Sequence, residues 1–221
     1  MPTRLSRYAE GVMEAAWLAS AIVVPLFYNV YSSRIFEPDK IALLRSLALF
    51  MLAAWLVHLY EAGVPPAEGE TPRWKVLLKT PIVLPVLLLT AVYLIATLFS
   101  VIPAISFYGS YQRLQGTYSL LSYLVIFGGL AANLRRREQI ERLVTTLILV
   151  SLPVSFYGLL QRNELDPVPW AGNVSRRIAA NMGNAIFVAA YLIMVVPLTI
   201  GRLIQAYRDI LDESRQNITS P

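Results

Sequence analysis

Six apolar runs, each about twenty residues long, separate the charged residues of this 221-residue chain. A helix rises about 1.5 Å per residue, so a run of that length crosses the roughly 30 Å hydrocarbon core of a bilayer. Without water nearby, backbone hydrogen bonds must close within each segment, which favours helices. The sequence therefore predicts an all-α, polytopic transmembrane helical bundle. The expected spans are residues 10–31, 41–60, 80–102, 118–134, 140–160 and 178–200.

Composition supports this class of protein. Hydrophobic residues make up 56% of the chain and charged residues only 15%, a more apolar balance than soluble domains show. The chain has no cysteine, which excludes disulfides, thiol catalysis and thiolate metal sites. A net charge of +5 in such a protein indicates cationic cytoplasmic loops rather than nucleic acid as a partner. We expect residues 1–207 to form the bundle and residues 208–221 a cytoplasmic tail.

The distribution of Lys and Arg predicts the orientation. With six spans, one face carries twelve of the 19 cations: Arg4, Arg7, Arg73, Lys75, Lys79, Arg135, Arg136, Arg137, Arg142, Arg202, Arg208 and Arg215. The other face carries six: Arg34, Lys40, Arg113, Arg162, Arg176 and Arg177. Cytoplasmic loops are the ones enriched in cations. Both termini are therefore predicted to be cytoplasmic, and the odd-numbered loops to face outward.

Outward cations work against that rule, and two interpretations stay open. Short polar loops need some charge for solvation, or a polyanionic ligand lies against this face. Arg45 raises a related choice, because it lies about one turn into the second expected span. It can snorkel to the outer headgroups, the interpretation we slightly favour, or face the bundle interior and help hold an anion.

The most polar part of the outward face is the loop that begins at Gln161 and leads through Arg176 and Arg177 into the last span. Glu164 and Asp166 lie in it, and they are candidates for a base or metal ligand, although surface solvation is the favoured interpretation. His58 is the only histidine and lies at the inner end of the second span, where we expect an interfacial residue. The sequence contains no Gly-rich phosphate loop, metal-ligand cluster or Ser/His/Asp spacing, so we predict no cofactor and no metal.

Two stretches in the second half of the chain resemble a known family. The segments YGLLQRNELDPVPW (157–170) and RRIAANMGNAIFVAAYLIMVVPL (176–198) are similar to the central part of the O-antigen ligase/polymerase family. The shared positions are Gln161, Asp166, Pro167, Arg177, Gly183, Asn184, Ala190, Tyr191, Leu192 and Pro197. Upstream, FEPDKIALLR (36–45) is similar to the start of the family's second helix, and GSYQRLQGTYSLLSY (109–123) to its third outward loop.

The resemblance implies a multi-pass glycosyltransferase of the bacterial inner (cytoplasmic) membrane that uses no nucleotide sugar. Its donor is a glycan on undecaprenyl pyrophosphate, and its acceptor is a hydroxyl on the outer face. Outward arginines would hold the pyrophosphate. By residue match Arg177 is the first candidate and Arg113 the second, with Arg176 and Arg45 as further candidates. The implied partners are membrane lipid and the lipid-linked glycan, and no catalytic residue is assigned.

The sequence also departs from the family. Members usually continue for several more helices and carry a large outward loop with a histidine that acts as the base. Here the sequence stops at Pro221 and the one histidine, His58, is at the other face. We therefore expect a donor-binding half that is inactive alone. The alternative is a non-catalytic accessory subunit that packs against other subunits of a larger membrane complex.

Overall fold

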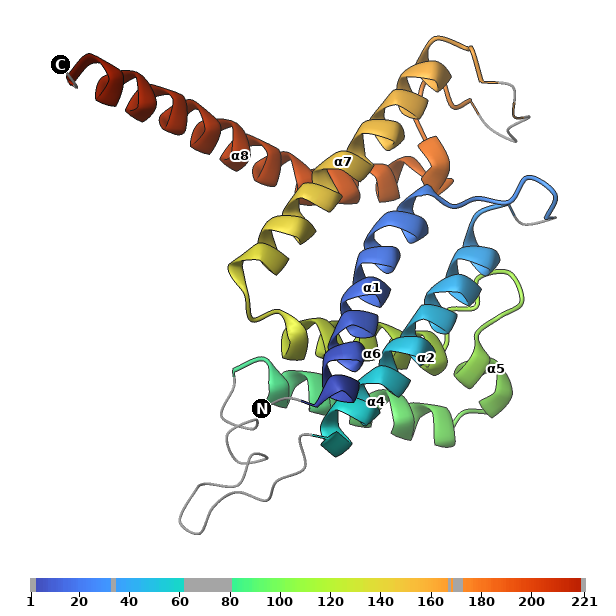
Figure 1. Ribbon diagram of the computed structural model, residues 1–221. Helices are drawn as coiled ribbons and strands as arrows, with labels where there is room; N and C mark the ends of the chain where they lie inside the picture. Colours follow the sequence, from blue (N-terminus) through green and yellow to red (C-terminus); the bar gives the residue numbers. More distant parts are fainter. Residues whose placement is uncertain (1–2, 33–34, 62–80, 167, 169–172, 220–221) are drawn as a thin grey trace. The chain divides into compact units, whose positions relative to one another are not determined.

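The described part of the chain is entirely helical (Figure 1). The computed structural model describes residues 3–32, 35–61, 81–166, 168 and 173–219, and within them it contains no strand. The helices are α1 (Arg4–Leu26), α2 (Glu37–Glu61), α4 (Val83–Leu98), α5 (Pro103–Tyr108), α6 (Thr117–Asn133), α7 (Arg137–Arg162), the 3-10 helix η1 (Ala180–Met182) and α8 (Ala185–Thr219).

Four of these helices, α1, α2, α7 and α8, are long and apolar enough to cross a membrane, while α4 and α6 are apolar but shorter. Only 17% to 33% of the most apolar window of each long helix is buried within the chain. The remaining apolar surface needs an apolar surrounding, because exposing it to water costs roughly 25 cal/mol per Å². The described fold is thus all-helical, with four helices that could span a membrane.

Local hydrogen bonding sets the ends of α1. The hydroxyl of Thr3 accepts a hydrogen bond from the backbone N–H of Ser6 at 3.0 Å, which is how an N-cap residue starts a helix. The helix therefore begins at Arg4, before the expected span 10–31. It ends at Leu26, one residue after Pro25, whose ring removes a backbone donor. The apolar residues 27–31 that we assigned to the span lie beyond the helix.

The last long helix begins later than expected. Gly183 adopts a left-handed φ of 76°, and the side chain of Asn184 accepts the backbone N–H of Ile186 at 3.0 Å. Together they end η1 and start α8 at Ala185, so residues 178–184 of the expected span are not part of it. At the other end, α8 runs without a break to Thr219 and takes in most of the tail expected at residues 208–221.

The chain divides into two compact units, which we describe separately. Unit 1 comprises Met1–Ser20 and Ser32–Arg135, and unit 2 comprises Ala21–Tyr31 and Arg136–Pro221. In unit 1, α2 packs along α6, where Met51 is fully buried against Gly129. The side chain of Asn133 donates to the carbonyl of Glu10, which connects α6 to α1.

Unit 2 has its own hydrophobic core between α7, η1 and α8. Its buried members are Val150, Val154, Ala180, Val188, Tyr191 and Val195. The hydroxyl of Tyr191 donates to the carbonyl of Leu147 at 3.1 Å, so the one polar atom of that side chain is satisfied. An ion pair between Arg202 of α8 and Glu141 of α7 adds a second connection between these helices.

We expect Gly129→Ala to destabilise unit 1. A Cβ at position 129 would lie 2.5 Å from the sulfur of Met51, which is 0% exposed and has little room to move. Overpacking of this kind costs about 1–3 kcal/mol. The measurement is thermal unfolding of the purified protein in detergent, where the variant should unfold at a lower temperature.

Gly11→Ala is the matched control, because a Cβ at Gly11 of α1 would meet nothing within 4 Å. It should unfold no earlier than the wild type, since alanine is the better helix former. Equal unfolding temperatures for Gly129→Ala and Gly11→Ala would contradict the close α2–α6 contact.

Candidate functional site

The Arg45 side chain lies inside unit 1, only 9% exposed. Its Nη2 is 2.7 Å from the carbonyl oxygens of both Tyr108 and Leu114, and its Nε is 3.2 Å from the hydroxyl of Ser119. The guanidinium carbon also lies 4.5 Å from the centre of the Tyr118 ring, a cation–π contact. Our favoured interpretation, a side chain snorkelling to headgroups, is therefore wrong, and the guanidinium faces the interior.

Arg113 lies in the turn that Arg45 holds. Its side chain is 70% exposed, and its Nε is 3.8 Å from a carboxylate oxygen of Glu37 at the start of α2. An ion pair this exposed contributes at most about 1 kcal/mol. The Arg113 guanidinium is thus available to a stronger anion, while its backbone N–H is fixed on the carbonyl of Ser110 at 3.1 Å.

The side chain of Gln161 organises the loop that follows α7 in unit 2. It is fully buried at 0% exposure. Its Oε1 accepts the backbone N–H groups of Ala179 at 3.1 Å and Ala180 at 2.8 Å. Its Nε2 donates to the carboxylate of Asp166 at 3.0 Å. One amide therefore connects the end of α7, the start of the loop at Asp166 and the turn before α8.

Asp166 takes part in this network, whereas we had favoured solvation at the surface for this residue. The hydroxyl of Tyr157 lies 3.0 Å from each of its carboxylate oxygens, and the backbone N–H of Val168 donates to it at 2.9 Å. The carboxylate is therefore occupied by neighbouring donors, which makes it a poor general base. Glu164, the other candidate, is exposed and has a left-handed φ of 58° just after the helix end.

Arg176 and Arg177 are both exposed at the far side of this loop. Asn173 fixes their backbone, because its side-chain oxygen accepts the N–H of Arg176 at 3.0 Å and its carbonyl accepts the N–H of Arg177 at 3.3 Å. Arg162 closes the loop from α7 by donating to the carbonyl of Ser175 at 2.8 Å. Within the described part of the chain, neither the Arg176 nor the Arg177 guanidinium makes a hydrogen bond or an ion pair.

The four predicted arginines thus fall into two pairs. In unit 1, Arg113 lies in the turn whose Tyr108 and Leu114 carbonyls the buried Arg45 side chain bonds. Arg176 and Arg177 are neighbours in unit 2. Each pair is described within its own unit.

The structure adds polar residues that sequence reasoning did not assign a role. Ser119 and Thr117 at the start of α6 are each 2% exposed, and Ser119 meets Arg45 while Thr117 meets Thr97 of α4. The sequence signal that could have identified them is a pair of hydroxyl residues in an apolar run, in a chain that also carries an arginine within another apolar run. The role of Gln161 had no comparable local signal, since its partners lie up to 19 residues along the chain.

His58 contacts the first helix rather than either arginine pair. Its Nδ1 is 3.3 Å from the hydroxyl of Ser6 and 3.8 Å from the carboxylate of Glu10. A catalytic relay uses the two ring nitrogens for two different partners, a nucleophile and an orienting carboxylate. Here Ser6 and Glu10 both lie near the same nitrogen, Nδ1. The three side chains therefore form a contact between α1 and α2 without the arrangement of a catalytic relay.

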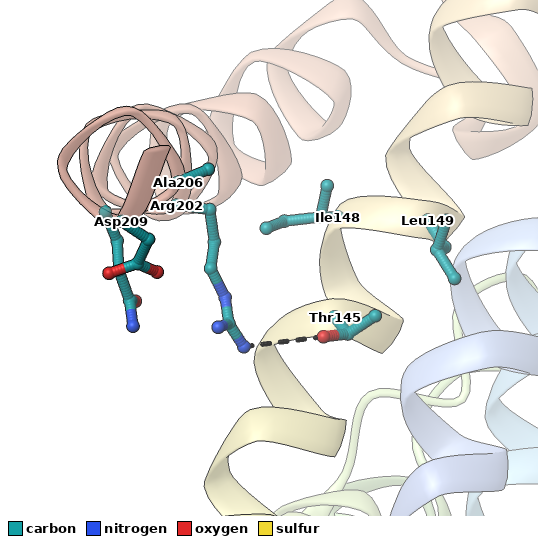
Figure 2. Close-up of a pocket in the computed structure, with 7 residues that line it drawn as sticks. Thr145, Ile148, Leu149, Arg202, Ala206 and Asp209 are labelled. Carbon is teal, nitrogen blue, oxygen red and sulfur yellow. Dashed lines mark hydrogen bonds between the residues drawn. The ribbon is translucent and has the colours of Figure 1, made fainter. Parts of the chain in front are cut away.

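A groove of about 390 Å³ lies between α7 and α8 in unit 2 (Figure 2). Its lining includes Thr145, Ile148 and Leu149 of α7 and Arg202 of α8. Arg202 already pairs with Glu141, and its Nη2 is 3.4 Å from the Thr145 hydroxyl (Figure 2). Thr145 is about 24 Å along α7 from Gln161, at 1.5 Å per residue. The groove is therefore not part of the arginine-bearing loop.

These observations define what the arrangement can do. Guanidinium groups on braced backbone bind phosphate oxygens through paired, charge-assisted hydrogen bonds. Among the residues that the structure describes, no cluster of three or more His, Asp or Glu could hold a metal ion. The chemistry that the described side chains favour is thus the binding of an anion.

We expect Gln161→Ala to loosen the loop without unfolding the protein. Removal of the amide leaves the N–H groups of Ala179 and Ala180 without their acceptor, at a cost of about 1–3 kcal/mol for a buried unsatisfied group. Hydrogen exchange at those two amides should become faster. Asn163→Ala is the control, since Asn163 is exposed and its side chain donates to the carbonyl of Leu159 in the preceding turn. Unchanged exchange in Gln161→Ala would contradict the bracing role.

Comparison with known proteins gives this site no relatives. Searches against protein-family models, curated proteins and solved structures find no match to the chain. Its function therefore has to be inferred from its own residues.

Proposed function

We propose that this chain is the donor-binding part of a glycosyltransferase of the O-antigen ligase/polymerase family in a bacterial inner membrane. Its donor would be a glycan on undecaprenyl pyrophosphate, and the acceptor a hydroxyl on the outer face. The similarity of residues 157–170 and 176–198 to that family motivates the proposal. Arg177 is the principal phosphate contact, with Arg176 beside it in unit 2, and Arg113 is a candidate anion contact of unit 1 by itself.

The observation that carries the proposal is the state of the Arg176–Arg177 pair. Both side chains are exposed, and their backbone is fixed by Asn173 on a loop that the buried Gln161 braces. Neither side chain has a carboxylate partner among the described residues. Fixed backbone and unneutralised charge are what recognition of a diphosphate requires, because little reorganisation is then needed on binding.

The same pair suits the chemistry of transfer. When an acceptor oxygen attacks the sugar, the bond to the pyrophosphate oxygen breaks and negative charge grows on the leaving group. Positive groups already in place stabilise that charge without having to rearrange. Arg177 and Arg176 would therefore act on the leaving group. The described residues do not assign a base for the acceptor hydroxyl.

The proposal includes six spans and cytoplasmic termini. It counts α4 and α6 as spans besides the four long helices. At 1.5 Å per residue, the 16 residues of α4 extend about 24 Å, somewhat less than the hydrocarbon core. Local thinning of the bilayer accommodates a short helix at modest cost. The excess of Lys and Arg on one face supports the direction of insertion.

Replacement of Arg177 should abolish glycan transfer. We expect Arg177→Ala to lower transfer at least about a hundredfold, the scale of losing one preorganised charge-stabilising donor, while its amount in the membrane stays normal. Arg177→Lys should retain part of the activity, since it keeps the charge but loses the paired geometry. The measurement is lipid-linked glycan consumed by membranes in which the variant replaces the native protein.

Arg135→Ala serves as the control, because Arg135 is exposed and falls on the face that the charge count predicts to be cytoplasmic. It should transfer glycan normally. Normal transfer by Arg177→Ala at wild-type protein levels would overturn the assignment of the phosphate contact.

The topology has an independent test, since the chain contains no cysteine and single cysteines can be introduced freely. We expect cysteines at Ser110 and Ser175 to react with a membrane-impermeant maleimide applied from outside the inner membrane. A cysteine at Arg135 should react only after the membrane is permeabilised. Equal external labelling at Arg135 and Ser175 would exclude the six-span arrangement.

A further inference from the structure

The Arg45 guanidinium bridges the two ends of a turn. The carbonyls of Tyr108 and Leu114 both lie 2.7 Å from its Nη2, and Arg113 is located between these two residues in the chain. The Tyr108 carbonyl ends α5 and has no helical partner, as is general for the last carbonyls of a helix. A backbone carbonyl that is partly withdrawn from water needs another donor. Arg45 therefore supplies what this turn lacks.

The turn is tight, and within it the backbone N–H groups of Arg113 and Leu114 both donate to the carbonyl of Ser110. Gly109 has a φ of +89° and Leu114 a φ of 50°, both left-handed. A Cβ on Gly109 would collide with the backbone of Leu114 and Gln115, and a Cβ on Gly116 would collide with Phe107. A non-glycine residue in the left-handed region costs free energy, which contacts from outside the turn offset. The Leu114 carbonyl has two such contacts, because it accepts from Arg45 at 2.7 Å and from the Ser119 hydroxyl at 2.6 Å.

The same bonds occupy the guanidinium. Its Nε and Nη2 both address the hydroxyl of Ser119, at 3.2 and 3.0 Å, in addition to the two carbonyls. These two nitrogens form one edge of the fork that would otherwise grip a phosphate in bidentate fashion. Arg45 has no ion pair within the described part of the chain, so these neutral acceptors are what compensates its buried charge.

We propose that Arg45 is a positioning residue for Arg113 rather than a contact to the phosphate. It clamps the turn from beneath, and Glu37, also on α2, pairs with Arg113 from the side. Helix α2 thereby holds the backbone from which the exposed Arg113 side chain extends. The clamp itself rests only on the contacts above, and its consequence for phosphate rests on the proposed function.

The clamp can be tested without any ligand. A nitroxide is attached to a cysteine introduced at the exposed Gln112, and its mobility is measured by electron paramagnetic resonance. Arg45→Gln, which loses the charge and the fork, should increase that mobility several-fold. Arg45→Lys, which reaches one carbonyl at a time, should give an intermediate value. A label at Gly11, whose surroundings are open, is the control and should not change.

An unchanged spectrum at position 112 in folded Arg45→Gln would overturn the clamp. Should that variant fail to fold, Arg45→Lys decides alone, because it keeps the buried charge but loses the fork that bonds both carbonyls. It should still increase the mobility at position 112 relative to the wild type. No increase in folded Arg45→Lys would likewise count against the clamp.

A second arm separates positioning from direct contact, with inorganic pyrophosphate as the probe. Binding is followed through the label at Gln112. Arg113→Ala should weaken it by about tenfold or more, as expected for loss of a charge-assisted contact. If Arg45 acts through Arg113, the double variant Arg45→Gln/Arg113→Ala should bind pyrophosphate little more weakly than Arg113→Ala alone. With Arg113 intact, Arg45→Lys should bind pyrophosphate more tightly than Arg45→Gln does. A further, additive loss would show that Arg45 touches the phosphate and would overturn the positioning role.

Absence of pyrophosphate binding in the wild type has a different meaning. It would exclude Arg113 as an anion contact, and with it that part of the proposed function. The mobility measurement would still decide whether Arg45 clamps the turn. The two failures are therefore distinguishable.

Discussion

A positive charge buried in a largely apolar helix bundle constrains everything around it. Arg45 is a permanent cation that is 9% exposed, and it has no carboxylate partner in the described chain. Such a group is tolerated only where enough oxygen atoms surround it. Here they are backbone carbonyls of the turn after α5 and the Ser119 hydroxyl on α6. The same hydrogen bonds compensate the buried charge and satisfy the carbonyls. They thereby hold α2, α5 and α6 together within unit 1.

Unit 2 solves a similar problem with a neutral group. The loop between α7 and α8 is held by the Gln161 amide, which both donates and accepts, and by Asp166 as a further acceptor. In each unit a buried side chain from a long helix bonds to the backbone of a polar segment. The segment's own arginines, Arg113 in one and Arg177 in the other, are then left exposed. In both units, buried polar hydrogen bonds thus hold the backbone of a segment whose cationic side chains are exposed.

The sequence predicts the helical runs of this chain better than it predicts their ends. Hydropathy reports which residues prefer lipid, and all six expected spans overlap an observed helix. Helix ends depend instead on single hydrogen bonds and backbone angles. Thr3 starts α1 early, and the left-handed Gly183 delays α8 until Ala185. Neither effect changes the mean hydropathy of a twenty-residue window, so neither can be read from it.

The candidate arginines were chosen by their place in the sequence, and the structure distinguishes them by what already occupies them. Arg45 was left open between snorkelling and the interior because hydropathy does not say where spare carbonyls lie, and those belong to residues 63 and 69 positions away. Once its partners are known, the edge of its fork formed by Nε and Nη2 is seen to be in use. Arg176 and Arg177 differ in that their backbone is fixed while their side chains have no described partner. A fixed backbone lowers the entropy lost on binding, and an unpaired guanidinium avoids competition from a protein carboxylate. That combination, rather than positive charge alone, is why the loop after α7 is the better place to seek an anionic ligand.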